Sequence, residues 1–157
     1  MKKINLCELL IFIFSAELVG VLSALLSGDM SEFYDTLVKP ALSPPGWLFP
    51  VVWTLLYALM GLSAYLIYSS KAALAVKKNA LIIYAAQLFV NFLWSIVFFR
   101  FESLRLAVAV IVILVTLLAW MILKFKKISP IAAYINIPYF LWTLFATYLT
   151  VSILVLN

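Results

Sequence analysis

The sequence predicts an all-α membrane protein, a bundle of five transmembrane helices with a long ordered loop between the first and the second. Hydrophobic residues make up 68% of the 157 residues and charged residues 11%, whereas soluble domains have roughly one-half and one-quarter. The charges also fall in clusters, and each stretch between clusters is long enough to span a bilayer. No stretch has the character of an interdomain linker, so residues 1–157 are expected to form one domain.

Uncharged stretches predict the last four helices. These stretches lie between Lys39 and Lys71, between Lys78 and Arg100, between Arg105 and Lys124, and after Lys127. Each can hold the roughly 17 to 25 residues that a membrane-spanning helix requires. The predicted helices are 47–70, 79–99, 104–123 and 130–156.

The first helix is predicted over residues 4–27, which are equally apolar but include Glu8 and Glu17. A signal peptide is disfavoured, because a glutamate interrupts the apolar core and no small-x-small cleavage site follows. Glu17 lies about two-thirds of the way along this helix. An ionisable group at such a depth suggests a functional site, and a purely structural hydrogen bond is the alternative.

Lysine and arginine counts predict the orientation in the membrane. An N-terminus inside the cell and a C-terminus outside leave only Lys39, Arg100 and Arg105 on the outer side. The remaining basic residues then lie inside, namely Lys2, Lys3, Lys71, Lys77, Lys78, Lys124, Lys126 and Lys127. We therefore expect an integral membrane protein with its N-terminus inside and its C-terminus outside. The net charge of +5 is a topology signal, and the lysines lack the clustered stripe that nucleic-acid binding needs.

The connection from Gly28 to Gly46 is the longest loop and faces outward in this topology. Loops of this length in compact domains are usually functional or disordered. Its prolines and large apolar residues favour an ordered lid, which Pro44 and Pro45 would stiffen.

The sequence lacks the residues that several kinds of metal, redox and catalytic site require. The chain has no histidine and one cysteine, Cys7, so no metal site, Cys-x-x-Cys pair or intrachain disulfide is expected. No glycine-rich phosphate loop or serine-hydrolase motif is present. We expect no required cofactor.

Aromatic and amide side chains at helical spacing predict a ligand-binding site instead. Residues three, four or seven apart share a face of a helix. The candidates are Ser23 on a small-residue face of the first helix, Trp53 and Tyr57 on the second, Gln87, Asn91 and Trp94 on the third, and Trp142, Phe145 and Ala146 on the fifth. Two alternatives stay open: small residues also serve close helix packing, and buried amides also bond neighbouring helices.

Several separate motifs are similar to those of one known family. They include Lys39-Pro40, Pro44-Pro45-Gly46-Trp47, Trp53, Leu56-Tyr57, Met60-Gly61, Gln87-Leu88, Asn91, Trp94, Pro138-Tyr139, Trp142 and Phe145-Ala146-Thr147. Nearly the whole chain resembles the TspO family of tryptophan-rich sensory and translocator proteins. The resemblance implies a homodimer of five-helix bundles, each with a pocket that opens toward the long first loop. Leu42 departs from the pattern, since the family usually has tryptophan there.

The resemblance also implies the ligands, which are porphyrins such as protoporphyrin IX and haem, and isoquinoline carboxamide or benzodiazepine-type molecules. Trp53, Asn91, Trp94, Trp142, Phe145 and Ala146 would line the pocket. Three function classes remain open. A binding or sensing protein needs only the pocket and the lid. An enzyme for light- and oxygen-dependent porphyrin breakdown would use Trp53 and Trp142, and a transporter would need access from both faces.

Overall fold

The computed structural model describes residues 4–157, and within that range the regular structure is entirely helical. Its elements are α1 (Leu6–Leu26), α2 (Met30–Thr36), α3 (Leu48–Tyr68), α4 (Leu74–Ser95), the π-helical turn η1 (Ile96–Arg100), α5 (Leu104–Ile128), α6 (Pro130–Ile135) and α7 (Ile137–Leu156). Five segments of the described chain are long and apolar enough to cross a membrane. The predicted five-helix membrane bundle is therefore confirmed.

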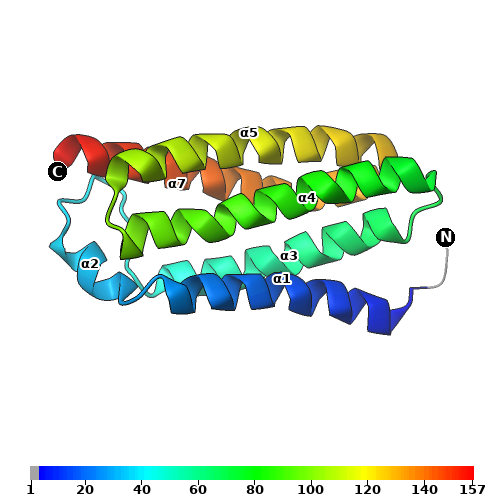
Figure 1. Cartoon of the computed structure of the whole chain (residues 1–157), viewed down its shortest axis with the longest axis horizontal. Helices are drawn as coiled ribbons and strands as arrows, with labels where there is room; N and C mark the ends of the chain where they lie inside the picture. The colour runs from blue at the N-terminus through cyan, green and yellow to red at the C-terminus, as the bar shows by residue number, and fades with distance from the viewer. Residues whose placement is uncertain (1–3) are drawn as a thin grey trace.

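The long helices run side by side, with the short helix α2 and the C-terminus at one end of the bundle and the N-terminus at the other (Figure 1). Helix α1 packs mainly on α3, α4 on α5, and α5 also on α6 and α7. Only Ala16 and Ser23 of α1 are buried, so this helix lies at the edge of the bundle. Close approach of α1 to α3 depends on Gly61, since a Cβ atom there would lie 2.6 Å from Ile13 Cα.

Two helices extend past their predicted ends. Helix α4 begins at Leu74 rather than at Asn79, and α5 runs to Ile128 rather than to Leu123. Both extensions include lysines, which the charge-gap argument had placed in loops. Long lysine side chains can keep the ammonium group in water while the backbone stays helical. Lys77 Nζ, for example, donates to the carbonyls of Tyr68 and Ser70 at the C-terminal end of α3, at 3.0 and 3.3 Å.

The predicted helix 130–156 is interrupted at Asn136, which ends α6 and precedes α7. Pro138 explains the break, because proline has no N–H to donate to the carbonyl four residues earlier. The Asn136 side chain is fully buried, and its Nδ2 donates to Ser63 Oγ and to the Ala132 carbonyl. A buried polar side chain thus joins this break to α3.

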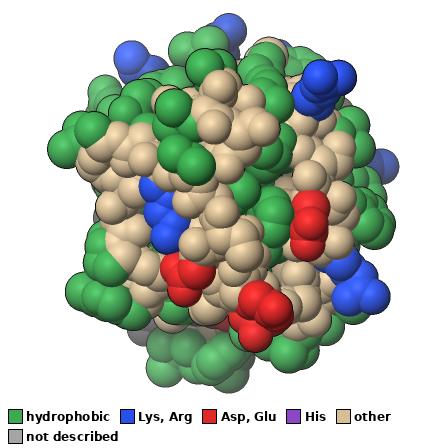
Figure 2. Space-filling view, turned by 90° about the vertical axis from the view of Figure 1, so that its left-hand side faces the viewer, with side chains coloured by type: hydrophobic (Ala, Val, Ile, Leu, Met, Phe, Trp, Pro, Cys, Tyr) green, Lys and Arg blue, Asp and Glu red, His purple; other side chains and the backbone are tan. Residues whose placement is uncertain are grey.

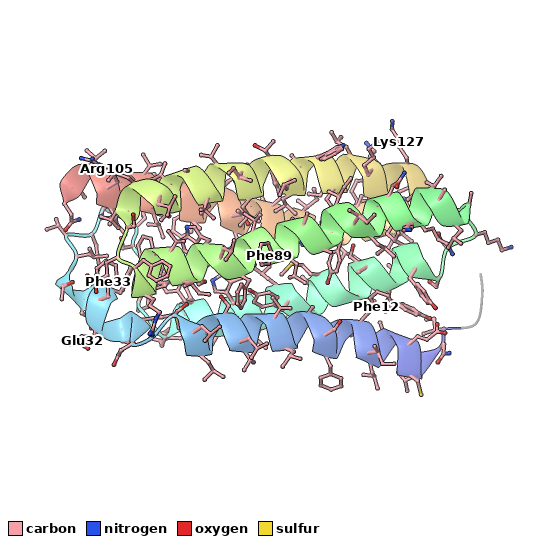
Figure 3. All side chains as sticks on the ribbon, viewed as in Figure 1. Phe12, Glu32, Phe33, Phe89, Arg105 and Lys127 are labelled. Atoms are coloured by element: carbon pink, nitrogen blue, oxygen red, sulfur yellow. The ribbon has the colours of Figure 1, made fainter. Side chains whose placement is uncertain are left out.

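Most charged side chains lie at the two ends of the bundle, and Glu17 within α1 is an exception. Arg105 and Lys127 mark the opposite ends of α5, with Phe89 between those levels on α4 (Figure 3). The end that carries α2 presents both carboxylates and basic groups (Figure 2). Lys2 and Lys3, part of the orientation prediction, lie outside the described residues.

Candidate ligand-binding site

A cavity of about 490 Å³ lies between α1, α3 and α4, beneath α2. Its volume is within the range of roughly 300 to 1,000 Å³ that is usual for small-molecule sites. Most of the lining residues are apolar or aromatic. The full set is Glu17, Gly20, Val21, Ser23, Ala24, Met30, Ser31, Tyr34, Gly46, Trp47, Phe49, Pro50, Trp53, Thr54, Tyr57, Trp94, Ser95 and Phe99.

Helix α3 supplies an aromatic wall. Phe49, Trp53 and Tyr57 follow one another at intervals of four residues, so they lie on one face of the helix. The ring centroids of Trp53 and Tyr57 are 5.7 Å apart, and Trp53 also meets Tyr139 edge to face at 6.1 Å. These contacts hold the Trp53 indole in place at the cavity wall.

Helix α1 supplies a smooth wall of small residues. A Cβ atom at Gly20 would collide with the Tyr57 ring, so that ring lies directly against the α1 backbone. One turn further on, Ser23 Oγ donates to the carbonyl of Phe92 on α4 at 3.0 Å. The small face therefore serves both close packing and the cavity.

The third wall comes from the end of α4 and from η1. Trp94 stacks on Phe98, with centroids 5.4 Å apart and planes inclined by 29°. The wider turn of η1, closed by the bond from Phe101 N to Ile96 O at 3.1 Å, follows directly and contributes Phe99 to the cavity. Trp94 is only 5% exposed, and its Nε1 has no partner among residues 4–157. This indole N–H is therefore buried without a hydrogen-bond partner in the described chain.

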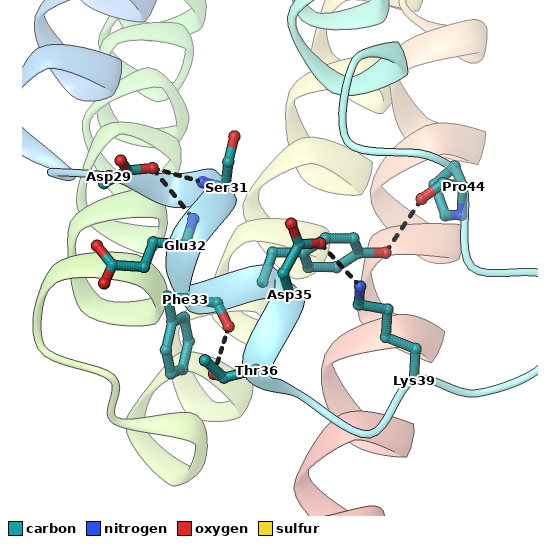
Figure 4. Close-up of polar contacts among 9 residues, drawn as sticks. Asp29, Ser31, Glu32, Phe33, Asp35, Thr36, Lys39 and Pro44 are labelled. Carbon is teal, nitrogen blue, oxygen red and sulfur yellow. Dashed lines mark hydrogen bonds and ion pairs between the residues drawn. The ribbon is translucent and has the colours of Figure 1, made fainter.

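Residues 28–46, hereafter the lid, cover this end of the bundle. Asp29 caps α2 by accepting from Ser31 N and Glu32 N, both at 3.1 Å (Figure 4). The Tyr34 hydroxyl donates to the Pro44 carbonyl at 3.2 Å, which joins the two halves of the lid (Figure 4). The predicted ordered loop is therefore a short helix followed by a turn-rich segment.

The lid is attached to α7 and to η1. Tyr148 of α7 donates to the Ala41 carbonyl at 3.1 Å, and the Asn157 side chain makes two hydrogen bonds of 3.0 Å to the Val38 backbone. Phe33 packs edge to face on Phe98 at 5.9 Å. Leu42, which departs from the motif expected from the resemblance, is 82% exposed with a φ of 69° and does not line the cavity.

Four of the predicted site residues line the cavity together: Ser23, Trp53, Tyr57 and Trp94. Pro44 and Pro45 are part of the lid but are absent from the cavity wall. Pro44 contributes through its carbonyl, which holds Tyr34, and Tyr34 does line the cavity.

The two predicted amides lie deeper, below the cavity floor. Asn91 Nδ2 donates to the Tyr57 hydroxyl at 3.2 Å, and the Tyr139 hydroxyl donates to Gln87 Oε1 at 2.9 Å. Gln87 and Asn91 are both almost fully buried. Asn91 therefore positions Tyr57. Both amides form hydrogen bonds to neighbouring helices, which is the alternative that the sequence had left open.

The three predicted residues of α7 are also outside the wall. Trp142 lies behind Phe49, with ring centroids 6.0 Å apart, and Phe145 packs on Trp142 at 5.6 Å. Ala146 is buried in the cluster formed with Trp94, Phe98 and Ile111. The structure thus places Trp142 one layer behind the cavity.

Sequence reasoning missed several lining residues, among them Phe49, Thr54, Met30, Tyr34 and Phe99. A signal for Phe49 was present, because it lies four residues before Trp53 on the same helix face. The lid residues had no such signal, since their position depends on the path of the loop.

The sequence model of the TspO/MBR family matches residues 12–156. The chain belongs to the TspO/MBR family. It is 37% identical over 131 residues to a tryptophan-rich protein TspO of Chlorobaculum tepidum, covering 81% of this chain and 80% of that protein. A tryptophan-rich sensory protein of Cereibacter sphaeroides is 39% identical over 134 residues, with 85% and 81% covered. A translocator protein homolog of Schizosaccharomyces pombe is 33% identical over 126 residues, with 79% and 77% covered.

These matches confirm the resemblance inferred from the motifs. Together with the five apolar helices, they identify this TspO/MBR protein as an integral membrane protein of a family whose members are named sensory and translocator proteins. The cavity lies within the matched range, and two of its three helical walls come from helices that carry the motifs, α3 and α4.

Proposed function

We propose that this TspO/MBR protein binds porphyrins, with protoporphyrin IX and haem as ligands, in the cavity beneath the lid and acts as a membrane-bound sensor of them. The observation that carries this proposal is the cavity of about 490 Å³ walled by Trp47, Trp53, Trp94, Phe49 and Tyr57. A flat macrocycle gains apolar burial and stacking against such rings, roughly 0.5 to 1.5 kcal/mol per aromatic pair beyond burial. Isoquinoline carboxamide and benzodiazepine-type molecules have the same flat aromatic character.

Iron is not expected to add affinity. The chain has no histidine, the commonest axial ligand of haem iron in binding proteins. Metal-free protoporphyrin should therefore bind at least as tightly as haem.

Quenching of tryptophan fluorescence by protoporphyrin IX tests the site. Trp53→Phe and Trp94→Phe each remove part of a lining indole, so we expect a three- to tenfold weaker affinity, equivalent to about 1 kcal/mol. Trp120→Phe is the matched control, because Trp120 lies on α5, is 50% exposed and does not line the cavity. Unchanged affinity in both lining variants would refute the site.

An enzymatic role is the first alternative, in which light and dioxygen break down bound porphyrin. It is favoured by the oxidisable chain in which Trp53 lies near Tyr57 and Tyr139. Trp53 and Trp142 are the proposed participants, with Trp142 acting from behind Phe49. Illumination in air should yield a distinct product that the double variant Trp53→Phe, Trp142→Phe does not form. Bleaching identical to that of free porphyrin would exclude this role.

Transport of porphyrin or another small hydrophobic ligand is the second alternative, and it would require a path through the bundle. The half of the bundle away from the lid is filled by a core that includes Met60, Phe125 and Tyr139. Ligand flux into proteoliposomes in the dark would support transport.

We also propose a homodimer in a bacterial cell membrane, with the N-terminus inside. The described basic residues support that orientation, since Lys71, Lys77, Lys78 and those of the α5 C-terminus are at the end opposite the lid. Protease protection of the lid in right-side-out vesicles would contradict it.

A further inference from the structure

Glu17 lies at the floor of the cavity. It is the deepest lining residue of α1, nine residues before Leu26 and thus about 13 Å along the helix axis from the lid end. Among the described residues that line the cavity, it alone has a carboxyl group.

The Glu17 carboxyl has no partner within residues 4–157. The hydrogen bonds made by α1 side chains and its N-terminal cap involve Asn5, Ser15, Ser23 and Ser27. The ion pair found in the described chain joins Lys39 to Asp35 in the lid. A carboxyl group inside a membrane helix is costly without a partner, so its presence in the cavity wall requires an explanation.

Tyr57 is the lining residue that lies next to Glu17. Tyr57, whose ring lies against Gly20 one turn from Glu17, accepts a hydrogen bond from Asn91 and keeps its own O–H proton to donate. The Glu17 carboxyl is therefore the one acidic group among the otherwise uncharged lining residues of the described chain.

We propose that Glu17 determines the class of ligand, favouring flat aromatic molecules that place a protonated amine or an N–H donor at the cavity floor and rejecting those that place a carboxylate there. An opposite charge in a site of low dielectric attracts strongly, whereas a like charge is repelled. This inference rests on the proposed function as a ligand-binding site. For protoporphyrin IX it means that the two propionates point away from Glu17, toward the lid.

Three pyrene probes with the same ring system test this preference. They are 1-pyrenemethylamine, which is cationic at neutral pH, 1-pyrenemethanol, which is neutral, and 1-pyreneacetate, which is anionic. Binding is followed by energy transfer from tryptophan to pyrene in detergent micelles. We expect the parent protein to bind the amine at least tenfold more tightly than the acetate, with the alcohol between them.

Glu17→Gln keeps the shape and removes the charge, so the amine-to-acetate ratio should fall to about threefold or less. Glu8→Gln is the matched control, because it removes a carboxylate from the same helix but does not line the cavity. It should keep the ratio of the parent. If Glu17→Gln does not fold, Glu17→Asp is measured in its place. It should bind the three probes in the same order as the parent protein, with a smaller amine-to-acetate ratio.

The outcomes separate this inference from the proposed function. Protoporphyrin quenching with equal binding of the three probes, or with a ratio that persists in Glu17→Gln, refutes the role of Glu17 and leaves the porphyrin site standing. A Glu17-dependent preference without protoporphyrin quenching refutes the porphyrin site and supports the role of Glu17. Absence of binding by every probe refutes the inference as well.

Discussion

Replacing Gly20 by alanine should disturb the candidate site through Tyr57. The new Cβ would lie 2.6 Å from Tyr57 Cδ2 and 3.0 Å from Cζ, with Cε2 closer still. Ordinary contacts between carbon atoms are about 3.5 to 4.0 Å, so the ring must move by roughly 1 Å. Tyr57 is only 6% exposed, and Trp53 and Asn91 hold it from the other sides.

The expected loss of stability follows from the packing and the hydrogen bond that the displaced Tyr57 ring would lose. Overpacking a well-filled core costs about 1 to 3 kcal/mol, and loss of the Asn91 hydrogen bond leaves a buried amide without its partner at a comparable cost. We expect Gly20→Ala to lower the free energy of unfolding by about 2 to 3 kcal/mol. Because the displaced ring also alters the cavity floor, affinity for protoporphyrin IX should fall about tenfold.

The assay combines thermal unfolding in detergent with fluorescence quenching by protoporphyrin IX. Gly46→Ala is the control, because Gly46 also lines the cavity but a Cβ atom there would meet nothing within 4 Å. It should leave stability and affinity close to those of the parent. A Gly20→Ala protein as stable and as tight-binding as Gly46→Ala would refute the close contact between α1 and the Tyr57 ring.

Two further changes test the packing that supports the site. Gly61→Ala would place a Cβ atom 2.6 Å from the Phe12 carbonyl oxygen, and a backbone atom cannot rotate away as a side chain can. We expect the free energy of unfolding in detergent to fall by about 1 to 3 kcal/mol. An unchanged melting temperature would contradict the close contact between α1 and α3. Asn136→Ala removes the donor to Ser63 and Ala132, so the free energy of unfolding should fall by about 1 to 2 kcal/mol in the same measurement. Asn79→Ala is the control, because Asn79 is exposed, and it should cost much less. Equal losses in the two variants would show that the buried hydrogen bonds contribute little.

The number and order of the spans could be predicted because charge is excluded from the bilayer core. The helix ends could not, since the same rule treats a snorkelling lysine as a loop residue. Lys77 shows the difficulty, because its charge reaches the end of α3 while its backbone is already part of α4.

Periodicity predicted which face of each helix is buried but not the depth of the cavity on that face. Asn91 and Trp94 share a face of α4, yet Tyr57 covers Asn91 and leaves Trp94 at the wall. Trp142 was expected at the wall on the basis of its motif, and Phe49 lies in front of it. Such layering depends on how closely two helices approach each other, which Gly20 and Gly61 determine for α1 and α3 and which periodicity does not describe.

The attachment of the lid has a consequence for the rate of ligand exchange. Its hydrogen bonds to α7, through Ala41 and Val38, are exposed to solvent, while the transmembrane helices hold the buried core. Segments with few buried contacts open at a small fraction of the free energy of global unfolding. We therefore expect a ligand to enter and leave by brief detachment of the lid from α7 while the five-helix bundle stays closed. The timescale is set by a few surface hydrogen bonds and by the packing of Phe33 on Phe98 and of Tyr34 on Phe49.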